Sequence, residues 1–411
     1  METPGVIRTA IAALAAVLAL SLAGCGSTRL LHETSTSTVS VGLASSSPTG
    51  GQGLDFPSLA TKNTTRVDGT DPVQDAAGVA LAVYPSAAPG THPQAVTLAP
   101  TDDWQAAIAA SVLMAAPIHA PVLLSGTGTL PTATSQALAE LAPTGSGSLD
   151  GAQLIRIGDV PSVHGLHADA IGGADPYTLA AGIAKFVNAV SGHSSSDVVI
   201  ASATSPAYAM PAAGWAAESG DPVLYVNATS VPAATRQALA SDQGAHIYVL
   251  GPSSVIPDSI LTQLRRYGTV KRVGATDPAA NSVAFAVYRD PACAYGQPCA
   301  HVPGSFGWAM RSPGHGYVLL NDARPLDAAA SAALSGSGDY GPQLLIEKPT
   351  SLPASVLNFF LDYATPGYTQ EGPTAAVYNH GWVIGDPSAI SVAVQAEVDN
   401  LLEVVPQSSA K

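Results

Sequence analysis

The residues with the most distinctive chemistry are three cysteines, and the first of them, Cys25, follows a leader-like N-terminus. Arg8 gives this N-terminus a positive charge, and the run from Thr9 to Gly24 is uncharged. The run is too short and too alanine-rich for a membrane span but has the proportions of a signal-peptide core. Leu22-Ala23-Gly24-Cys25 matches the bacterial lipobox, in which the cysteine is acylated after cleavage. We therefore predict a signal peptide at 1–24 and a lipidated Cys25 on the outer face of the cytoplasmic membrane.

Two alternatives exist for this N-terminus. It could be an ordinary signal peptide followed by a chance cysteine, or an uncleaved anchor helix. The lipobox is favoured because cysteine is rare in the chain and this one stands where the motif needs it.

The other two cysteines, Cys293 and Cys299, enclose Ala-Tyr-Gly-Gln-Pro in a stretch rich in glycine and proline. In an exported protein, such a pair is expected to form a disulfide that closes a small loop. The alternative is a metal site that includes the nearby His301, but such a site would need further ligands. We predict the disulfide.

Residues for catalysis, for a cofactor or for a metal do not form a complete motif. No serine stands in a Gly-x-Ser-x-Gly elbow, and no glycine-rich stretch completes a nucleotide-binding motif. His164 and His167 form His-x-x-His in a polar loop, without the glutamate of a zinc protease. Asp102 and Asp103 stand before a helix, where capping is a better use than glycoside hydrolysis. We predict no catalytic residue, no cofactor and no metal.

One group of cations stands out from the acidic background: Arg265, Arg266, Lys271 and Arg272. Guanidinium groups bind phosphate and carboxylate through two parallel hydrogen bonds, so these side chains and Arg66 could line a groove for an anionic polymer. In the structural alternative, the adjacent arginines complement a helix C-terminus and the other cations pair with aspartates such as Asp68.

The elements that would position these residues occur three times. A phrase containing glycine and ending in Asp-Pro appears at 66–72, 171–176 and 272–278, each time before an alanine-rich helical pattern. Aspartate accepts hydrogen bonds from the free amides of a first helical turn, and proline suits the first helical position. We predict a strand, a glycine turn and a capped helix in each copy, with N-caps at Asp71, Asp175 and Asp277.

Further landmarks recur in a fixed order: a short apolar strand, an alanine-rich helix, a strand after proline, another helix, and a last strand that runs into glycine. We place the last strands before Gly158, Gly251 and Gly381. Short apolar strands that alternate with helices predict parallel sheets covered on both faces. The predicted fold class is α/β, with three tandem repeats of a short parallel sheet flanked by helices.

The landmarks also divide the chain. We assign residues 65–165, 166–270 and 271–405 to repeats one, two and three. The third repeat holds extra residues at about 289–313, including both paired cysteines, which we interpret as a surface insertion. Residues 25–64 are rich in serine, threonine and glycine and are predicted to form a flexible tether.

The formal net charge of the chain is −14. An acidic surface disfavours nucleic acid and anionic lipid headgroups as general partners. We therefore predict no nucleic-acid partner, and a membrane link through the lipid on Cys25 alone.

With these landmarks, residues 66–402 resemble the type 2 cell wall-binding repeat family. Its members usually have three copies, each with Arg-x-x-Gly-x-Asp-Arg, an Asp-Ala-Leu helix, a Pro-Ile-Leu-Leu strand and a strand ending in Gly-Gly. The resemblance implies three Rossmann-like modules in a pseudo-threefold arrangement, and binding of anionic wall polymers. The candidate polymer-binding residues are Arg66, Arg272, Arg265, Arg266, Lys271 and Asp327.

The copies depart from the family pattern in several places. The second copy has Ile171 where we place the opening arginine, and proline replaces the arginine that follows the aspartate in every copy. The aspartate of the Asp-Ala-Leu helix is present as Asp327, whereas the first two copies have Ala107 and Tyr208 near that place. The scaffold is therefore better kept than the polymer-binding residues.

These observations predict a lipid-anchored, non-catalytic envelope protein that binds a cell-wall anionic polymer or peptidoglycan. One alternative is an envelope scaffold that binds a protein partner and has no affinity for glycans. Another is a solute-binding protein or hydrolase whose cleft lies at strand carboxyl ends and contains Asp71, Asp175 or Asp327.

Overall fold

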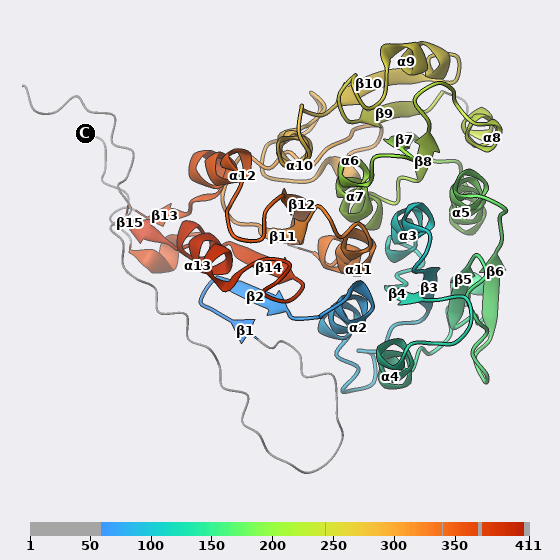
Figure 1. Cartoon of the computed structure of the whole chain (residues 1–411), viewed down its shortest axis with the longest axis horizontal. Coiled ribbons are helices and arrows are strands. Elements are labelled where there is room, and N and C mark those ends of the chain that lie inside the picture. Colours follow the sequence, from blue (N-terminus) through green and yellow to red (C-terminus); the bar gives the residue numbers. More distant parts are fainter. Residues whose placement is uncertain (1–58, 243, 339, 369–371, 407–411) are drawn as a thin grey trace, which may run out of the picture. The chain divides into compact units, whose positions relative to one another are not determined.

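The computed structural model describes residues 59–406 except 243, 339 and 369–371 (Figure 1). The predicted signal peptide, Cys25 and most of the predicted tether lie outside the described residues. Among the helices described, none combines the length and apolarity needed to cross a bilayer.

Three sheets have the same parallel strand order, which confirms the α/β class. The first sheet is ordered β4 (Val122–Ser125), β3 (Val96–Pro100), β5 (Leu154–Ile157) and β6 (Ala168–Ile171). The second is ordered β8 (Val223–Val226), β7 (Asp197–Ser202), β9 (His246–Leu250) and β10 (Thr269–Val273). The third is ordered β12 (Tyr340–Ile346), β11 (Gly316–Asn321), β14 (His380–Ile384) and β2 (Thr64–Val67), and the antiparallel β1 (Leu59–Ala60) extends it.

The opening strand of each repeat lies in the sheet of the preceding repeat. β6 pairs with β5, and β10 pairs with β9. The opening strand of the first repeat, β2, pairs with β14 of the third, with Thr64 opposite Gly381. The three repeats therefore close into a ring, in which the two ends of the repeated region share one sheet.

The Asp-Pro phrases mark the points where the chain passes from one sheet to the next. They begin helices α2 (Pro72–Val83), α5 (Pro176–Ser191) and α10 (Pro278–Val287). The aspartate side chains Asp71, Asp175 and Asp277 accept hydrogen bonds from first-turn amides, as predicted. Helix α2 packs on β4, α5 on β8 and α10 on β12, so each capped helix covers the sheet of its own repeat.

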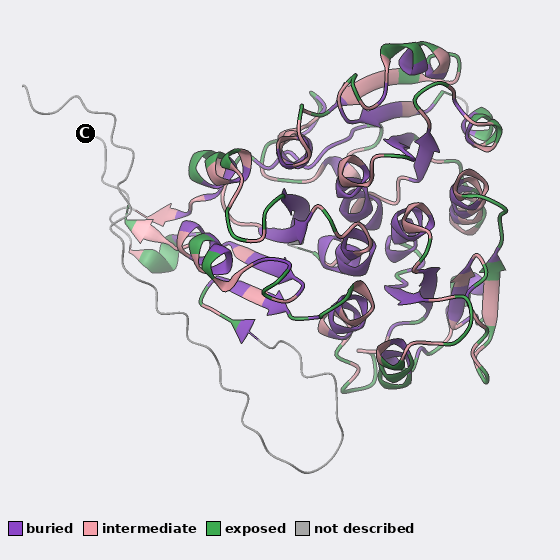
Figure 2. Cartoon of the chain, in the orientation of Figure 1, coloured by how far each residue is buried: buried purple, intermediate pink, exposed green. Residues whose placement is uncertain are grey.

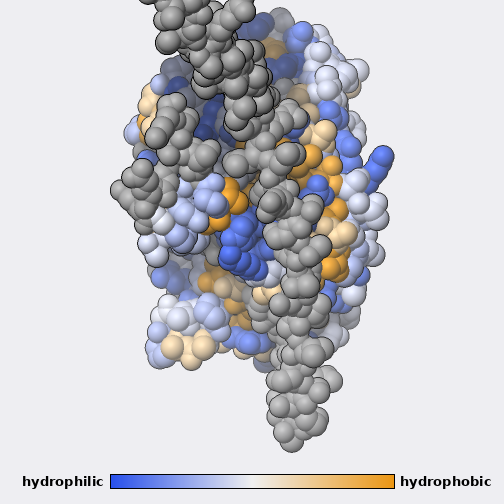
Figure 3. All heavy atoms as spheres, turned by 90° about the vertical axis from the view of Figure 1, so that its left-hand side faces the viewer, coloured by the Kyte–Doolittle hydropathy of each residue, from blue (hydrophilic) through white to orange (hydrophobic). Residues whose placement is uncertain are grey.

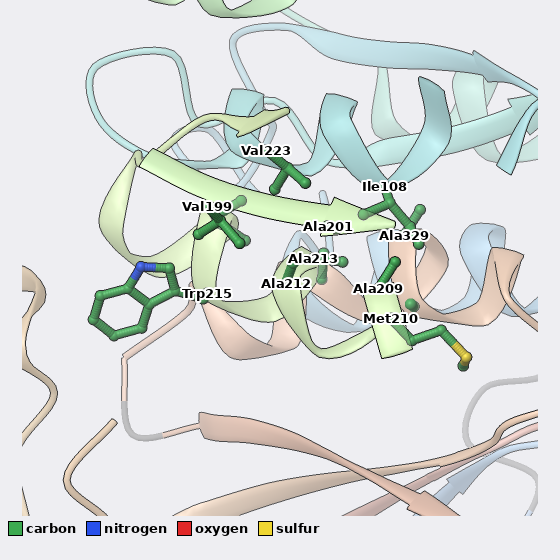
Figure 4. Packing of buried hydrophobic residues seen from close by; sticks show 14 of the residues in the cluster. Ile108, Val199, Ala201, Ala209, Met210, Ala212, Ala213, Trp215, Val223 and Ala329 are labelled. Atoms are coloured by element: carbon green, nitrogen blue, oxygen red, sulfur yellow. The ribbon is translucent and has the colours of Figure 1, made fainter. Parts of the chain in front are cut away.

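Three alanine-rich helices meet between the sheets: α3 (Trp104–Ala110), α7 (Pro211–Ser219) and α11 (Leu326–Ser335). A Cβ atom on Gly214 would lie 2.7 Å from the Ser335 hydroxyl, so glycine is needed where α7 approaches α11. Figure 4 shows Ala212 and Ala213 of α7 in one cluster of buried side chains with Ile108 of α3 and Ala329 of α11. The strands and these helices carry the buried core (Figure 2).

The remaining elements connect or cover the sheets. They are η1 (Ser111–Met114), α4 (Thr132–Leu141), η2 (Gly147–Leu149), α6 (Pro206–Ala209), α8 (Ala233–Ser241), α9 (Asp258–Leu264), η3 (Cys299–His301), α12 (Ala354–Phe359), η4 (Phe360–Ala364), β13 (Gly367–Tyr368), η5 (Pro373–Ala375), α13 (Val392–Leu401) and β15 (Val405–Pro406).

The last strand of the third repeat differs from the prediction. It is β14, and it runs into Gly385 instead of Gly381. Gly381 lies inside the strand, where an added Cβ would meet side-chain carbons of Leu402 and Thr64 at 3.1 and 3.2 Å. This glycine therefore serves close packing, and the turn glycine is four positions later.

The start of the fold and the insertion also differ from the prediction. Residues 59–64, which we assigned to the tether, form β1, a turn and the start of β2 at the edge of the third sheet, and the Asn63 amide donates to Asp399 at 2.6 Å. The insertion is not confined to the surface, because its Phe306 and Trp308 are buried. The Phe306 ring stacks on Tyr248 with centroids 3.8 Å apart, which makes part of the insertion a cover for the second sheet.

Candidate functional site

The same glycine turn lies at the carboxyl end of each sheet. The amides of Gly158, Gly251 and Gly385 donate to the carbonyl oxygens of Ile171, Val273 and Val67 at 2.9, 2.8 and 2.8 Å. All three glycines have positive φ, at 67°, 119° and 92°, which side chains disfavour. The three copies therefore share one backbone turn, and it lies at the sheet edge where α/β proteins usually bind ligands.

Arg66 was predicted to line a surface groove, and the structure corrects this. The side chain is fully buried, and its guanidinium donates to the carbonyl oxygens of Gly385 and Ile390 at 2.6 and 2.7 Å. Its Nε donates to Gln395 Oε1 at 2.9 Å. Burial lowers the pKa of Arg66, and the charge of Asp68 opposes this shift. Arg66 thus stabilises the turn after β14, and its side chain is not accessible to a polymer.

Arg272 occupies the corresponding place in the second sheet. It donates to the carbonyl oxygens of Gly251 and Ile256, each at 2.7 Å, and forms an ion pair with Asp258 at 2.8 Å. Its side chain is 21% exposed, so the outer edge of the guanidinium meets solvent at this ion pair. Its main contacts are nevertheless those of Arg66.

The first sheet has its arginine on the neighbouring strand. The residue at the register position of Arg66 and Arg272 is Ala170, and not Ile171 as the sequence comparison had placed it. Ala170 pairs with Arg156 of β5, and Arg156 Nη2 donates to the Val160 carbonyl at 2.6 Å. In this sheet the arginine therefore stands on β5 instead of the opening strand, but it still stabilises the turn after Gly158.

The other predicted cations do not gather into one groove. Lys271 forms an ion pair with Asp290 of the insertion at 2.6 Å and lies 5.3 Å from the ring centroid of Tyr248. Arg265 and Arg266 follow helix α9 and are exposed. Of the predicted cluster, only these two arginines are fully available to a ligand.

A buried ion-pair cluster joins the first repeat to the third. Arg324 Nη2 lies 2.5 Å from Asp75 Oδ2 of α2, and Arg324 Nε lies 2.7 Å from Asp327 Oδ2 of α11. Both carboxyl groups are fully buried. Burial raises the pKa of Asp75, the charge of Asp327 adds to that shift, and Arg324 opposes it. Burial also raises the pKa of Asp327. Because Asp327 is fully buried, this predicted polymer ligand lies inside the protein.

A cavity of about 480 Å³ lies at the carboxyl end of the first sheet. Asp102, Asp103, Asp159 and Asp175 line it, together with Gly158. Asp103 caps α3 by accepting from the Ala106 amide at 2.8 Å, as predicted, and burial raises its pKa. A cavity lined by four aspartates repels an anionic polymer.

A larger cavity of about 750 Å³ is shared by all three repeats. Its lining includes Met114 at the end of η1, Ala217 and Glu218 near the end of α7, Gly336 after α11, and Cys293 of the insertion. Burial raises the pKa of Glu218 to about 7. This cavity is mostly apolar in its lining residues and carries an acidic group instead of a cation.

A group of arginines and tyrosines that the sequence did not single out lies on the insertion. The Tyr295 ring centroid is 4.1 Å from the Arg289 guanidinium and 5.2 Å from that of Arg311. Arg311 also lies 5.6 Å from the ring centroid of Tyr363, near the end of η4. Tyr295 is 50% exposed, and Arg311 is exposed. The nearness of Tyr295 to the paired cysteines was visible in the sequence, but the approach of Tyr363 to Arg311 depends on the fold.

The remaining candidates have structural surroundings. Cys293 and Cys299 form a disulfide, as predicted. His164 and His167 lie exposed in the loop between β5 and β6. Among the described residues, no three His, Cys, Asp or Glu side chains are grouped to hold a metal ion.

Part of the chain matches one family model, and solved structures share its fold. Residues 170–261, from β6 into α9, match the model of cell wall binding domain 2 (CWB2). No curated protein matches the chain. Among solved structures, Cwp6 from Clostridium difficile is similar with a TM-score of 0.62 and 17% identity over 83% of this chain and 48% of that one. Cwp8 from Clostridium difficile is similar with a TM-score of 0.60 and 15% identity over 83% of this chain and 52% of that one. The chain thus spans about half the length of the structures it matches.

Proposed function

We propose that this chain, whose residues 170–261 match the model of cell wall binding domain 2, is a lipid-anchored, non-catalytic envelope protein. We propose further that it binds an anionic glycopolymer or peptidoglycan of the cell wall. The match to the second repeat is the observation that carries this proposal. The glycine turn, the arginine that holds it and the Asp-Pro cap recur in the other two repeats, which supports three copies of one binding architecture.

The charge distribution restricts where an anionic polymer can bind. The chain carries a net charge of −14, and its first-sheet cavity is lined with aspartates. Binding therefore needs a local positive surface that the polymer meets at short range, because exposed charges farther apart than about 8–10 Å are screened at physiological salt. Exposed arginines such as Arg265 and Arg266 supply such a charge, whereas Arg66 and Asp327 are buried.

Lipid attachment rests on the motif Leu22-Ala23-Gly24-Cys25. Expression of the full chain in a bacterium supplied with labelled palmitate should give a labelled protein. The Cys25→Ser chain should take up no label, whereas Cys293→Ser should be labelled like the unchanged chain. Equal labelling of Cys25→Ser and the unchanged chain would reject acylation at this cysteine.

Wall binding is tested by sedimentation of the full chain with purified wall sacculi, before and after acid stripping of anionic polymers. Binding that is lost on stripping indicates a polymer ligand, and binding that survives indicates peptidoglycan. No sedimentation with either preparation would contradict the proposed function and direct the search to protein partners.

A further inference from the structure

We propose that Arg311, together with the rings of Tyr295 and Tyr363 beside it, forms the contact site for an anionic group of a wall glycan. This inference rests on the proposed function and gives it a location. Tyr295 and Arg311 lie on the insertion of the third repeat, Tyr363 lies near the end of η4, and none of the sequence-predicted polymer ligands belongs to this site.

The geometry presents a guanidinium group in a form suited to anions. Arg311 lies 5.2 Å from the ring centroid of Tyr295 and 5.6 Å from that of Tyr363. Contact with an aromatic ring occupies the face of a guanidinium and leaves the N–H donors along its edge available. Two rings from different segments restrict Arg311 before a ligand arrives, which lowers the entropy lost on binding.

Several contacts hold the scaffold beneath this site. Arg289 Nη1 donates to the carbonyl oxygens of Pro291 at 3.2 Å and Cys293 at 2.5 Å, which fixes the start of the loop. The Cys293–Cys299 disulfide closes the loop around Tyr295. The insertion is in turn held by the buried Trp308, whose ring is 5.3 Å from that of Trp215.

The surroundings suit a sugar chain. Four large hydrophobic side chains are exposed among the described residues, and all of them lie in the third repeat: Tyr295, Leu361, Val377 and Tyr378. Val377 lies beside Gly314, three positions after Arg311, because a Cβ on Gly314 would be 3.2 Å from that of Val377. Figure 3 views the molecule from the left-hand side of Figure 1, the side of β13 and β15, and shows apolar side chains exposed among polar ones. Exposed rings next to cations offer both stacking and charge to a glycan that carries phosphate or carboxylate.

Charge complementarity favours an anionic glycan at this site. Arg289 and Arg311 both lie against one ring, Tyr295, and so concentrate positive charge on a chain of net charge −14. The same cations lower the pKa of Tyr295, with Arg289 as the main cause. A local positive surface on an acidic protein attracts an anionic polymer to this place and repels it elsewhere.

The test compares variants of the full chain in the sedimentation assay with unstripped and stripped walls. Arg311→Ala should weaken binding by about tenfold, the usual order for one charge-assisted contact. Arg311→Lys keeps the charge but loses the planar edge, and Tyr295→Leu keeps Arg311 but loses one ring, so both should bind more weakly than the unchanged chain. The matched control is Arg236→Ala, which removes an exposed arginine of the second repeat and should bind like the unchanged chain. Thermal midpoints close to that of the unchanged chain would exclude unfolding as the cause.

The outcomes separate this inference from the proposed function. If the unchanged chain binds and Arg311→Ala binds equally well, the inference is wrong and the wall-binding function stands. Equal binding by Arg311→Lys or Tyr295→Leu would also overturn the ring-held site. If the unchanged chain binds neither wall preparation, both ideas fail. If Arg311→Ala binds more weakly to unstripped walls only, the anionic group belongs to the polymer that stripping removes. If it binds more weakly to stripped walls, the anionic group is a carboxylate of peptidoglycan.

Discussion

Arg66 and Arg272 make the same contact in two different sheets: each guanidinium donates to the carbonyl oxygen of the glycine that ends the neighbouring strand, at 2.6 Å to Gly385 and 2.7 Å to Gly251. Arginines at repeated positions in a repeated architecture invite a ligand-binding interpretation. Their hydrogen-bond partners assign them instead to holding the turn at the carboxyl end of each sheet.

Replacing these arginines should therefore affect stability more than binding. Arg66→Ala leaves buried carbonyl oxygens without donors and should lower the free energy of unfolding by about 3–5 kcal/mol. Arg272→Ala, at a partly exposed position, should lower it by about 1–2 kcal/mol. Urea unfolding and wall sedimentation of each variant check this. A variant of unchanged stability that no longer binds walls would show that the arginine contacts the polymer.

Removing Arg324 should destabilise the protein more at high pH than at low pH. Arg324→Gln leaves the buried Asp75 and Asp327 without their cation, and an uncompensated buried charge typically costs about 3–5 kcal/mol. Burial raises the pKa of both carboxyl groups in the folded state, so both take up a proton more readily than ordinary aspartates as the pH falls. Urea unfolding at pH 8 should show the larger loss, and at pH 5 a smaller one. The exposed pair Lys62–Glu403 gives the control, because Lys62→Gln should cost less than about 1 kcal/mol at either pH. An Arg324→Gln loss that is the same at both pH values would contradict the prediction.

Asp221→Asn should stabilise the protein at pH 8. Trp215 Nε1 donates to Asp221 Oδ2 at 2.7 Å, and burial raises the pKa of this carboxyl to about 7. A carboxyl whose pKa is raised by folding favours the folded state when protonated, and this contribution is lost as the pH rises from about 4 to about 7. Asparagine keeps the acceptor and cannot ionise, so the variant should gain roughly 1–2 kcal/mol at pH 8 and nothing near pH 4.

Asp386 provides the control of opposite sign. Hydrogen bonds from Ser388 lower its pKa, so its contribution is present at neutral pH and lost as the pH falls through its folded-state pKa. Asp386→Asn should therefore lower the thermal midpoint at pH 7. The same sign of change for both variants at pH 8 would contradict these assignments.

Loss of the disulfide should weaken both the insertion and wall binding. Replacing Cys293 and Cys299 together with serine should lower the free energy of unfolding by about 2 kcal/mol, the chain-entropy value for so short a loop. Tyr295 lies within this loop, so the variant should also sediment less with walls. Retention of full binding by the double variant would mean that the loop needs no closure for binding.

Local features of the fold could be predicted from the sequence. Asp71, Asp175 and Asp277 cap their helices as predicted, because a cap depends on residues within one turn. The alternation of short apolar strands with alanine-rich helices was sufficient for the α/β class. The apolar run Trp382-Val383-Ile384 before Gly385 also indicates the last strand. We placed the end of that strand at Gly381, four residues too early.

Features that depend on distant partners could not be predicted. The sequence assigns β2 to the first repeat, yet its hydrogen bonds are made with β14 at the other end of the chain. An arginine that binds backbone carbonyl oxygens, such as Arg66, has no sequence signature that separates it from a surface arginine. The site around Arg311 was missed for the same reason, because Tyr363 approaches it only in the folded chain.

The pairing of β2 with β14 also governs the order in which the molecule can be completed. During synthesis from the N-terminus, β2 emerges first but must wait for its partner until nearly the whole chain has been made. Until then the third sheet cannot close, and β2 presents an unpaired edge that other chains could join. Solenoids can gain or lose a unit at either end, but here a fourth copy would separate β2 from its partner. The architecture therefore fixes its own copy number, and a truncated chain should be more prone to aggregation than the number of missing residues suggests.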